Sequence, residues 1–358
     1  MMTKALYTLL ICTICALQAA DDRTSIQDLI NHNEIPAFTE DYNDQVLDLS
    51  NRSIYRLNGL LNIPGIQETN VLNLNGNNIT QLPSGLFNQL PQLRYIYLAH
   101  NQIASIKGAF NQSGIEGFDL SHNQLTKLER DSFNKEMRDE HFYIFDFSHN
   151  KISEIEKDIF KGIHLGFGGE INLSHNKIKD IYPIFNGLTS AGETTIDVSH
   201  NHVKFEKNAS NPFNKNLHME VLNLSHNEID NDTIIYLLLQ RAKKNYTPMT
   251  YVSHNKIKHI HSDTIKKLKN LGLHEDDMEF DIARNKLSPH ATKRIENTIN
   301  AIKKGLKDKG ADLNFICRPQ QVLYTQAASS SASMHDDEIT NSNQLTNLSE
   351  QLTDRLFL

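Results

Sequence analysis

The sequence INLSHNKIKDI at residues 171–181 recurs in nearly the same form elsewhere in the chain. FDLSHNQLTKL occupies residues 118–128, and VLNLSHNEI occupies residues 221–229. In each copy, apolar and polar residues alternate over a few positions, an asparagine follows, and another apolar residue comes two positions later. This alternation over so short a stretch predicts one short strand with one buried side per copy.

Ten copies of the phrase align, with steps of 22 to 30 residues between their asparagine positions. Arg52 holds that position in the first copy. The other nine copies have asparagines that we expect to form a structural ladder: Asn77, Asn101, Asn123, Asn150, Asn176, Asn201, Asn227, Asn255 and Asn285. The pattern resembles the leucine-rich repeat, LxxLxLxxNxL, over roughly residues 45–288.

The resemblance implies an α/β fold, a leucine-rich repeat solenoid shaped as a curved horseshoe. A parallel sheet would line its concave face, its convex face would be helical or irregular, and a helical cap would close its C-terminal end. Of the 30 core positions in the ten copies, only Thr250 is not apolar. One repeat cannot bury this apolar face alone, so neighbouring repeats must cover one another. Phenylalanines that recur after the asparagines predict a second apolar spine under the convex face: Phe87, Phe110, Phe133, Phe160, Phe185 and Phe213.

The ends of the chain differ from the repeats. Lys4 is followed by a short apolar run and small residues, which is the layout of a cleaved secretory signal. The expected organisation is a signal peptide (1–20), an N-terminal cap (21–44), about ten repeats (45–288), a helical C-terminal cap (289–324) and a disordered tail (325–358). We therefore expect a secreted, periplasmic or cell-surface protein without a transmembrane segment. Loss of the signal leaves Cys317 alone, which excludes an intramolecular disulfide. The missing Cys-paired caps of animal extracellular repeats favour an exported, bacterial type.

The concave face is the expected binding surface, because strand residues that do not enter the core line it. The candidate binding residues are Tyr95, Tyr97, Asp119, Ile144, Asp146, Glu170, Asp197, Tyr251 and Asp281. The twenty concave positions considered hold seven acids and no base, which favours a basic or polar partner surface. Tyr95 and Tyr97 form the expected anchor, since tyrosine is favoured at binding hot spots. Two simpler explanations stay open, the repeat consensus for the acids and strand propensity for the tyrosines.

A histidine precedes the ladder asparagine in seven repeats: His100, His122, His149, His175, His200, His226 and His254. Strand spacing would stack these residues in a column, where protonation near pH 6 would place like charges side by side. The alternative is that SHN is only a frequent way to write this turn. His200 and His202 form an HxH pair, as do His259 and His261, but neither has a Cys or carboxylate at the usual ligand spacing. We predict no metal and no cofactor.

The sequence predicts a recognition protein and no enzyme. Asp119, Ser121 and His122 supply the residue types of a catalytic triad, but an open concave sheet offers no enclosed pocket or oxyanion donors. The formal net charge of −7 argues against nucleic acid as the main partner. We expect another protein as the partner. The alternatives are a structural or adhesive surface protein and a secreted effector that acts in a host cell.

Overall fold

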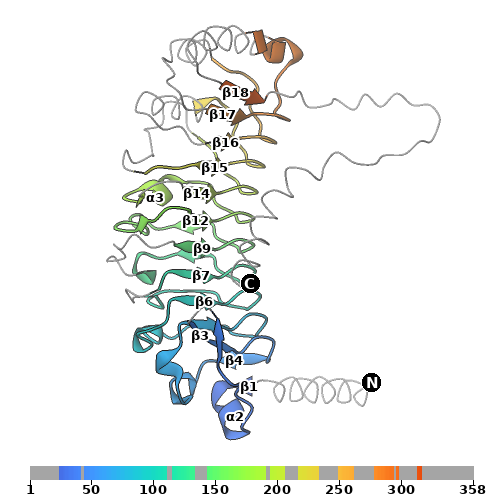
Figure 1. Cartoon of the computed structure of the whole chain (residues 1–358). Helices are drawn as coiled ribbons and strands as arrows, with labels where there is room; N and C mark the ends of the chain where they lie inside the picture. The colour runs from blue at the N-terminus through green and yellow to red at the C-terminus, as the bar shows by residue number, and fades with distance from the viewer. Residues whose placement is uncertain are drawn as a thin grey trace, which may run out of the picture.

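The computed structural model describes residues 24–41, 44–110, 115–133, 143–190, 194–205, 217–233, 249–261, 278–293, 296–297 and 313–316. Figure 1 shows these residues wound into stacked turns, each of which contributes one strand to a common sheet. The predicted leucine-rich repeat solenoid is confirmed. The expected signal peptide, the tail and Phe213 lie outside the described residues.

The sheet has twelve strands that lie almost in sequence order. Its eleven parallel strands are β3 (Asp44–Asp48), β5 (Val71–Asn73), β6 (Tyr95–Tyr97), β7 (Gly117–Asp119), β9 (Ile144–Asp146), β12 (Gly169–Asn172), β14 (Thr194–Asp197), β15 (Val221–Asn223), β16 (Met249–Tyr251), β17 (Met278–Asp281) and β18 (Leu313–Ile316). At the N-terminal edge, β2 (Thr39–Asp41) pairs with β3 in the antiparallel sense. We call the solvent side of this sheet the concave face.

The register between strands is the one that the repeat alignment requires. Tyr97 pairs with Asp119, and Asp119 pairs with Asp146, so equivalent positions of successive repeats lie side by side. Core positions such as Leu72 and Leu74 are fully buried, and Thr250 at its core position is also 0% exposed. Each repeat therefore buries its apolar face only against the repeats beside it.

Short elements connect the strands on the other side of the core. They are the 3-10 helices η1 (Leu60–Asn62), η2 (Ile66–Glu68), η3 (Phe87–Gln89) and η4 (Arg130–Ser132), the helix α3 (Tyr182–Phe185), and the short strands β4 (Ile54–Arg56), β8 (Lys127–Leu128), β10 (Glu154–Ile155), β11 (His164–Leu165) and β13 (Thr189–Ser190). The predicted phenylalanine spine stacks there, with ring centroids 5.6 Å apart for Phe87 and Phe110 and 6.1 Å apart for Phe133 and Phe160. With Asp232 and Ser262 as caps, the sequence also predicts convex helices over residues 233–243 and 263–271, which lie outside the described residues apart from Thr233.

The nine ladder asparagines fasten each turn to the one before it. Asn123 shows the pattern: its Nδ2 donates to the carbonyl oxygens of Leu98 and Leu120, at 2.9 and 3.1 Å. Its Oδ1 accepts from the backbone N–H of Ile103 at 2.9 Å. The same arrangement recurs from Asn77 to Asn285. These amides satisfy backbone groups that the turn leaves unpaired inside the core.

The residue before each ladder asparagine adopts a left-handed backbone conformation. The seven column histidines have φ between 53° and 55°, Gly76 has φ 67°, and Arg284 has φ 54°. Asparagine, aspartate and histidine enter this region more readily than other non-glycine residues, which explains part of the SHN motif. The turn reverses the chain out of the sheet and directs each histidine side chain to the same flank.

Both ends of the sheet have further elements. At the N-terminal end, β1 (Thr24–Ser25) leads into α2 (Ile26–Asn31), and Ser25 and Asp28 form a capping box. At the other end, Ser288 Oγ accepts from the N–H of Ala291 at 3.2 Å, and residues 289–293 are helical. The rest of the expected C-terminal helical cap lies outside the described residues, apart from residues 296–297 and β18. Within the described ranges, no helix combines the length and the apolar character needed to cross a bilayer.

Candidate functional site

The centre of the concave face holds a strip of carboxylates on adjacent strands. Asp119 on β7 pairs with Asp146 on β9, and Glu170 on β12 lies beside Ile144 and Thr195. Asp197 on β14 pairs with Asn172. We call Asp119, Asp146, Glu170 and Asp197 the acidic strip. All four side chains are partly buried, so each is held in place while part of it faces solvent.

Hydrogen bonds orient the aspartates of the strip. In each case Oδ1 accepts from the backbone N–H two residues later, at 2.8 Å for Ser121, 2.7 Å for Ser148 and 2.7 Å for Ser199. The second oxygen of Asp146 accepts from Asn172 Nδ2 at 3.1 Å, and that of Asp197 accepts from Asn223 Nδ2 at 3.0 Å. The three aspartate carboxylates are therefore oriented in the free protein.

Ionisation of the acidic strip is energetically unfavourable. Burial, and then the neighbouring Asp146 and Asp197, raise the pKa of Glu170 from 4.5 to about 7. Burial, and then Asp119, also raise the pKa of Asp146, whereas the hydrogen bonds from Ser148 and Asn172 lower it. The pKa of Asp197 is raised by burial as well. A cation placed against the strip would remove this cost, because it would favour the ionised forms.

The two candidate anchor tyrosines differ in their surroundings. Tyr97 lies beside Asp119, and burial followed by that carboxylate raises its pKa to about 12. The Tyr95 hydroxyl donates to Glu116 Oε2 at 2.8 Å, and its ring covers Gly117, where an added Cβ would lie 3.1 Å from Tyr95 Cδ1. Tyr95 thus contributes an apolar ring to the face, while its polar end is already bonded.

Arg94 completes this network. Its Nε and Nη2 donate to the two oxygens of the buried Glu116 at 2.7 and 2.8 Å, and its Nη1 donates to Asp44 Oδ1 at 3.2 Å. Sequence reasoning missed this pair, although Arg94 and Glu116 stand at equivalent positions just before two paired strands. The pair fixes the ring of Tyr95 at the N-terminal end of the strip.

The remaining candidate residues lie farther along the face or contribute less surface. Ile144 pairs with Glu170, and Tyr251 pairs with Asp281 three strands or more away from Glu170. Asp281 is buried, and its Oδ1 accepts from the N–H of Ala283 at 2.7 Å. Tyr95, Tyr97, Ile144 and the acidic strip therefore lie together in one area of the concave face. Tyr251 and Asp281 lie outside this area, toward the C-terminal end of the sheet.

Phe167 is a surface feature that the sequence analysis did not single out. Its side chain is 69% exposed, on the turn just before β12, between Gly166 and Gly168. The signal was present in the letters LGFGGE, where a large apolar residue stands among glycines. It lies three residues before Glu170, on the turn that leads into β12.

The seven column histidines form a continuous stack on the flank where the strands end. Successive ring centroids are 4.0 to 4.3 Å apart, with planes inclined by 7° to 13°. Burial, followed by neighbouring histidines, lowers the pKa of His122, His149, His175 and His200, and that of His226 falls to about 4. At the far end, Arg284 Nη1 lies 3.1 Å from His254 Nε2 and can donate to it.

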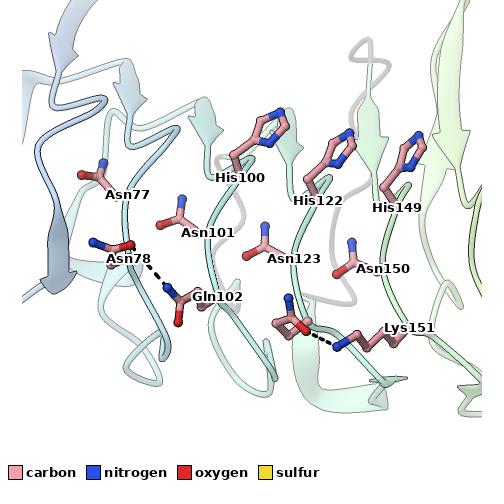
Figure 2. A pocket seen from close by; sticks show the side chains of 11 residues that line it. Asn77, Asn78, His100, Asn101, Gln102, His122, Asn123, His149, Asn150 and Lys151 are labelled. Atoms are coloured by element: carbon pink, nitrogen blue, oxygen red, sulfur yellow. Dashed lines mark hydrogen bonds between the residues drawn. The ribbon is translucent and has the colours of Figure 1, made fainter. Parts of the chain in front are cut away.

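An open groove of about 510 Å³ runs along the N-terminal part of this column. Figure 2 shows its three parallel rows. The rows consist of the column histidines His100, His122 and His149, the ladder asparagines Asn77, Asn101, Asn123 and Asn150, and the polar residues Asn78, Gln102, Gln124 and Lys151. We call this feature the flank groove.

No group of three or more His, Cys, Asp or Glu side chains among the described residues is arranged to hold a metal ion. The members of the HxH pairs have other contacts: His202 Nδ1 lies 2.9 Å from Glu228 Oε1, and His261 Nδ1 lies 2.6 Å from Asp232 Oδ1. The stacked rings of the column are parallel, so their nitrogens do not converge on a common point.

Comparison with known proteins gives sequence matches in two parts of the chain. A family model described as "Leucine rich repeat" matches residues 45–103 and 67–114, and a second, "Leucine Rich repeat", matches residues 215–237. Fibromodulin of Oryctolagus cuniculus is 31% identical over 121 residues, which cover 32% of this chain and 78% of that sequence. Leucine-rich repeat-containing G-protein coupled receptor 6 of Homo sapiens is 33% identical over 85 residues, or 22% of this chain.

The chain spans only 9% of the length of that receptor, and 22% of the length of Keratocan of Bos taurus, which is 35% identical over 78 residues. Among solved structures, the leucine-rich repeat domain of APL1B has a TM-score of 0.45 and 14% identity, and the match covers 82% of this chain and 76% of that one.

These three sequence relatives are vertebrate proteins, so they give no support to the bacterial type that the absence of Cys-paired caps favoured. The repeat itself is supported by the family models, the fibromodulin match and the register of the sheet. The chain belongs to the leucine-rich repeat family.

Proposed function

We propose that this chain is an exported, non-enzymatic recognition protein that binds another protein through its concave face. Proteins of this family commonly mediate protein–protein interaction, and one relative is by name a receptor. The observation that carries the proposal is the acidic strip, in which hydrogen bonds orient the three aspartates and Asp119 lies beside Tyr97. Export rests on the signal-like N-terminal segment of the sequence.

The chemistry of the face favours a basic partner surface. Ionising Glu170 or Asp146 is unfavourable in the free protein, and a lysine or arginine from the partner would compensate for it. The rings of Tyr97 and Tyr95 would supply the apolar contact area that hot spots need. The exposed Phe167, on the turn that leads into β12, would extend this area.

Affinity capture tests the proposal with three full-length proteins. The test variant is Asp119→Asn/Asp146→Asn/Glu170→Gln, which removes three charges with little change of shape. The matched control, Glu34→Gln/Glu68→Gln/Asp180→Asn, removes three charges at exposed positions outside the strip. We expect one partner to bind the wild type and the control, and to be retained at least about tenfold less by the test variant.

Circular dichroism of all three proteins must first show the same fold. Equal retention of every captured protein by the test variant and the wild type would contradict binding at the strip. Failure to capture any protein from extracts of the source or its surroundings would favour the structural or adhesive role instead.

A further inference from the structure

The flank groove offers hydrogen-bonding groups that the protein itself does not use. Among the described residues, no protein group forms a hydrogen bond with the ring nitrogens of His100, His122 or His149, and all three side chains are exposed. On the opposite wall, Gln102 Nε2 donates to Asn78 Oδ1 at 3.3 Å, and Lys151 bonds to Gln124 Oε1. The groove therefore has imidazole edges along one wall and amides with one ammonium group along the other (Figure 2).

The stacking of the histidines limits what can bind. Each inner ring has both faces covered by its neighbours at 4.1 to 4.3 Å, so only the ring edges are available. A nucleic acid base needs an open aromatic face on which to stack, and inner rings such as His122 offer none. Side-chain amides suit hydroxyl groups, while imidazole N–H and ammonium groups suit acidic groups.

We propose that the flank groove binds an acidic polysaccharide, a linear chain with hydroxyl groups and regularly spaced carboxylates or sulfates. The amides of Asn78, Gln102 and Gln124 bind its hydroxyls. The column histidines and Lys151 bind its acidic groups. Each row contains one residue from each repeat, so the rows run along the solenoid axis. This arrangement suits a linear ligand that lies in the same direction. This site lies on the flank of the solenoid, apart from the concave face on which the proposed protein partner would dock.

The charge of the column makes this binding dependent on pH. Burial and the neighbouring histidines lower the pKa of His122 and His149, so these two rings are mostly neutral at pH 7.5. The charged groups that face this part of the column are Asp119, which favours protonation of His122, and Lys151 at the end of the groove. Farther along stand the other column histidines and Arg284, whose charge opposes protonation of His226.

Because ligand binding and protonation of the column are thermodynamically linked, the direction of the pH dependence of affinity can be derived. Protonating neighbouring rings about 4 Å apart is unfavourable in the free protein, and a bound polyanion screens that repulsion. The complex therefore takes up protons, and whatever takes up protons on binding binds more tightly as pH falls. We expect affinity to rise by about tenfold between pH 7.5 and pH 5.5, within the usual range of such coupling.

The experiment is a titration of the full chain by isothermal calorimetry at both pH values. The probes are a heparin oligosaccharide with sulfates and carboxylates, a hyaluronan oligosaccharide with carboxylates only, neutral dextran, and a single-stranded oligothymidylate. We expect one or both acidic polysaccharides to bind more tightly at pH 5.5, and dextran not to bind. The two acidic probes distinguish sulfate from carboxylate recognition.

Two triple variants separate the groove from general charge effects. His100→Asn/His122→Asn/His149→Asn removes three imidazoles from the groove, and asparagine tolerates the left-handed backbone there. The control, His32→Asn/His259→Asn/His290→Asn, removes three exposed imidazoles elsewhere. We expect the groove variant to lose at least about tenfold in affinity at pH 5.5, and the control to match the wild type.

Three results would overturn the inference. The first is that neither acidic polysaccharide binds at pH 5.5. The second is that both triple variants lose affinity equally, which would assign the effect to net charge. The third is that the oligothymidylate binds more tightly than the polysaccharides, which would make nucleic acid the ligand.

Discussion

Side chains at equivalent positions of neighbouring repeats interact with one another. The ladder asparagines illustrate this, because each one bonds to backbone groups of its own turn and of the preceding turn. The acidic strip shows the same rule for function: the ionisation of Glu170 depends on Asp146 and Asp197, which come from the repeats on either side. A substitution at a ladder asparagine or in the acidic strip should therefore also affect the neighbouring repeats.

Asn77 and its neighbour Asn78 provide a matched test of the ladder. Asn77 is buried and bonds to the N–H of Ile54 and to the carbonyl oxygens of Leu49 and Leu74, whereas Asn78 is exposed. Asn77→Ala leaves these groups unpaired, so we expect a loss of about 2–4 kcal/mol in the free energy of unfolding. Asn78→Ala should cost less than about 0.5 kcal/mol. Urea denaturation measures both, and equal losses would contradict the ladder's role.

Glu170→Gln tests the cost of charge in the acidic strip. The pKa of Glu170 is raised to about 7 in the folded protein, so its contribution to stability is present at low pH and is lost as pH rises through 7. Glutamine cannot ionise, and the variant should gain roughly 1–3 kcal/mol over the wild type between pH 4.5 and pH 8.

Urea denaturation at pH 4.5 and pH 8 gives this difference. The same substitution at the exposed Glu68 on η2 measures the background effect of replacing a carboxylate by an amide. If the stability of Glu170→Gln relative to the wild type is the same at pH 8 as at pH 4.5, ionisation of Glu170 does not destabilise the folded protein.

At the scale of elements, the turn that leaves each strand determines both the stack and the groove. Its left-handed residue is a histidine in seven repeats, Gly76 in another, and Arg284 in the last copy. The same backbone requirement that permits histidine there also places all seven rings on one flank. The conformation of this turn thus accounts both for the histidine in the repeat motif and for the row of histidine rings on the flank.

His175 allows the backbone and ring contributions of this turn to be separated. Its φ of 53° is unfavourable for a β-branched residue, so His175→Val should lower the free energy of unfolding by about 1–3 kcal/mol. His175→Asn should be within about 1 kcal/mol of the wild type, because asparagine tolerates this conformation. Thermal unfolding ranks the two variants, and a valine protein as stable as the asparagine protein would exclude strain at this turn.

The elements also show what could be predicted from the sequence. The strands, their register and the ladder follow from the spacing of apolar residues and asparagines, because position 98, for example, must enter the same core as position 120. The bond from Tyr95 to Glu116 did not follow, because it joins residues 21 positions apart that the repeat consensus does not specify. The burial of Asp281 and the exposure of Phe167 depend on the packing of particular turns and not on the consensus.

At the scale of the whole molecule, stability is built up from contacts between adjacent repeats. Each parallel strand pairs only with the strands beside it in the sheet. A solenoid of this kind behaves approximately as a one-dimensional array, so a whole unit can be removed if the register is kept.

Deletion of residues 173–197 tests this property. It joins Asn172 to Val198, which occupies the same repeat position as Leu173, and leaves Asp119, Asp146 and Glu170 in place. We expect a folded protein with a parallel-sheet circular dichroism spectrum and a lower urea midpoint. Deletion of residues 173–185, about half a repeat, breaks the register and should abolish cooperative unfolding. Equal behaviour of the two deletions would contradict the array description.

Site-specific photo-crosslinking in the full chain, mixed with source extract, tests whether a protein partner docks on the concave face. A photoreactive residue at Thr195, beside Glu170 in the sheet, is compared with one at Asn88, an exposed residue next to Phe87 on η3, on the other side of the core. We expect a protein adduct from position 195 that disappears in the Asp119→Asn/Asp146→Asn/Glu170→Gln background, and none from position 88. An adduct of the same partner from position 88 alone would place the recognition surface elsewhere and contradict docking on the concave face.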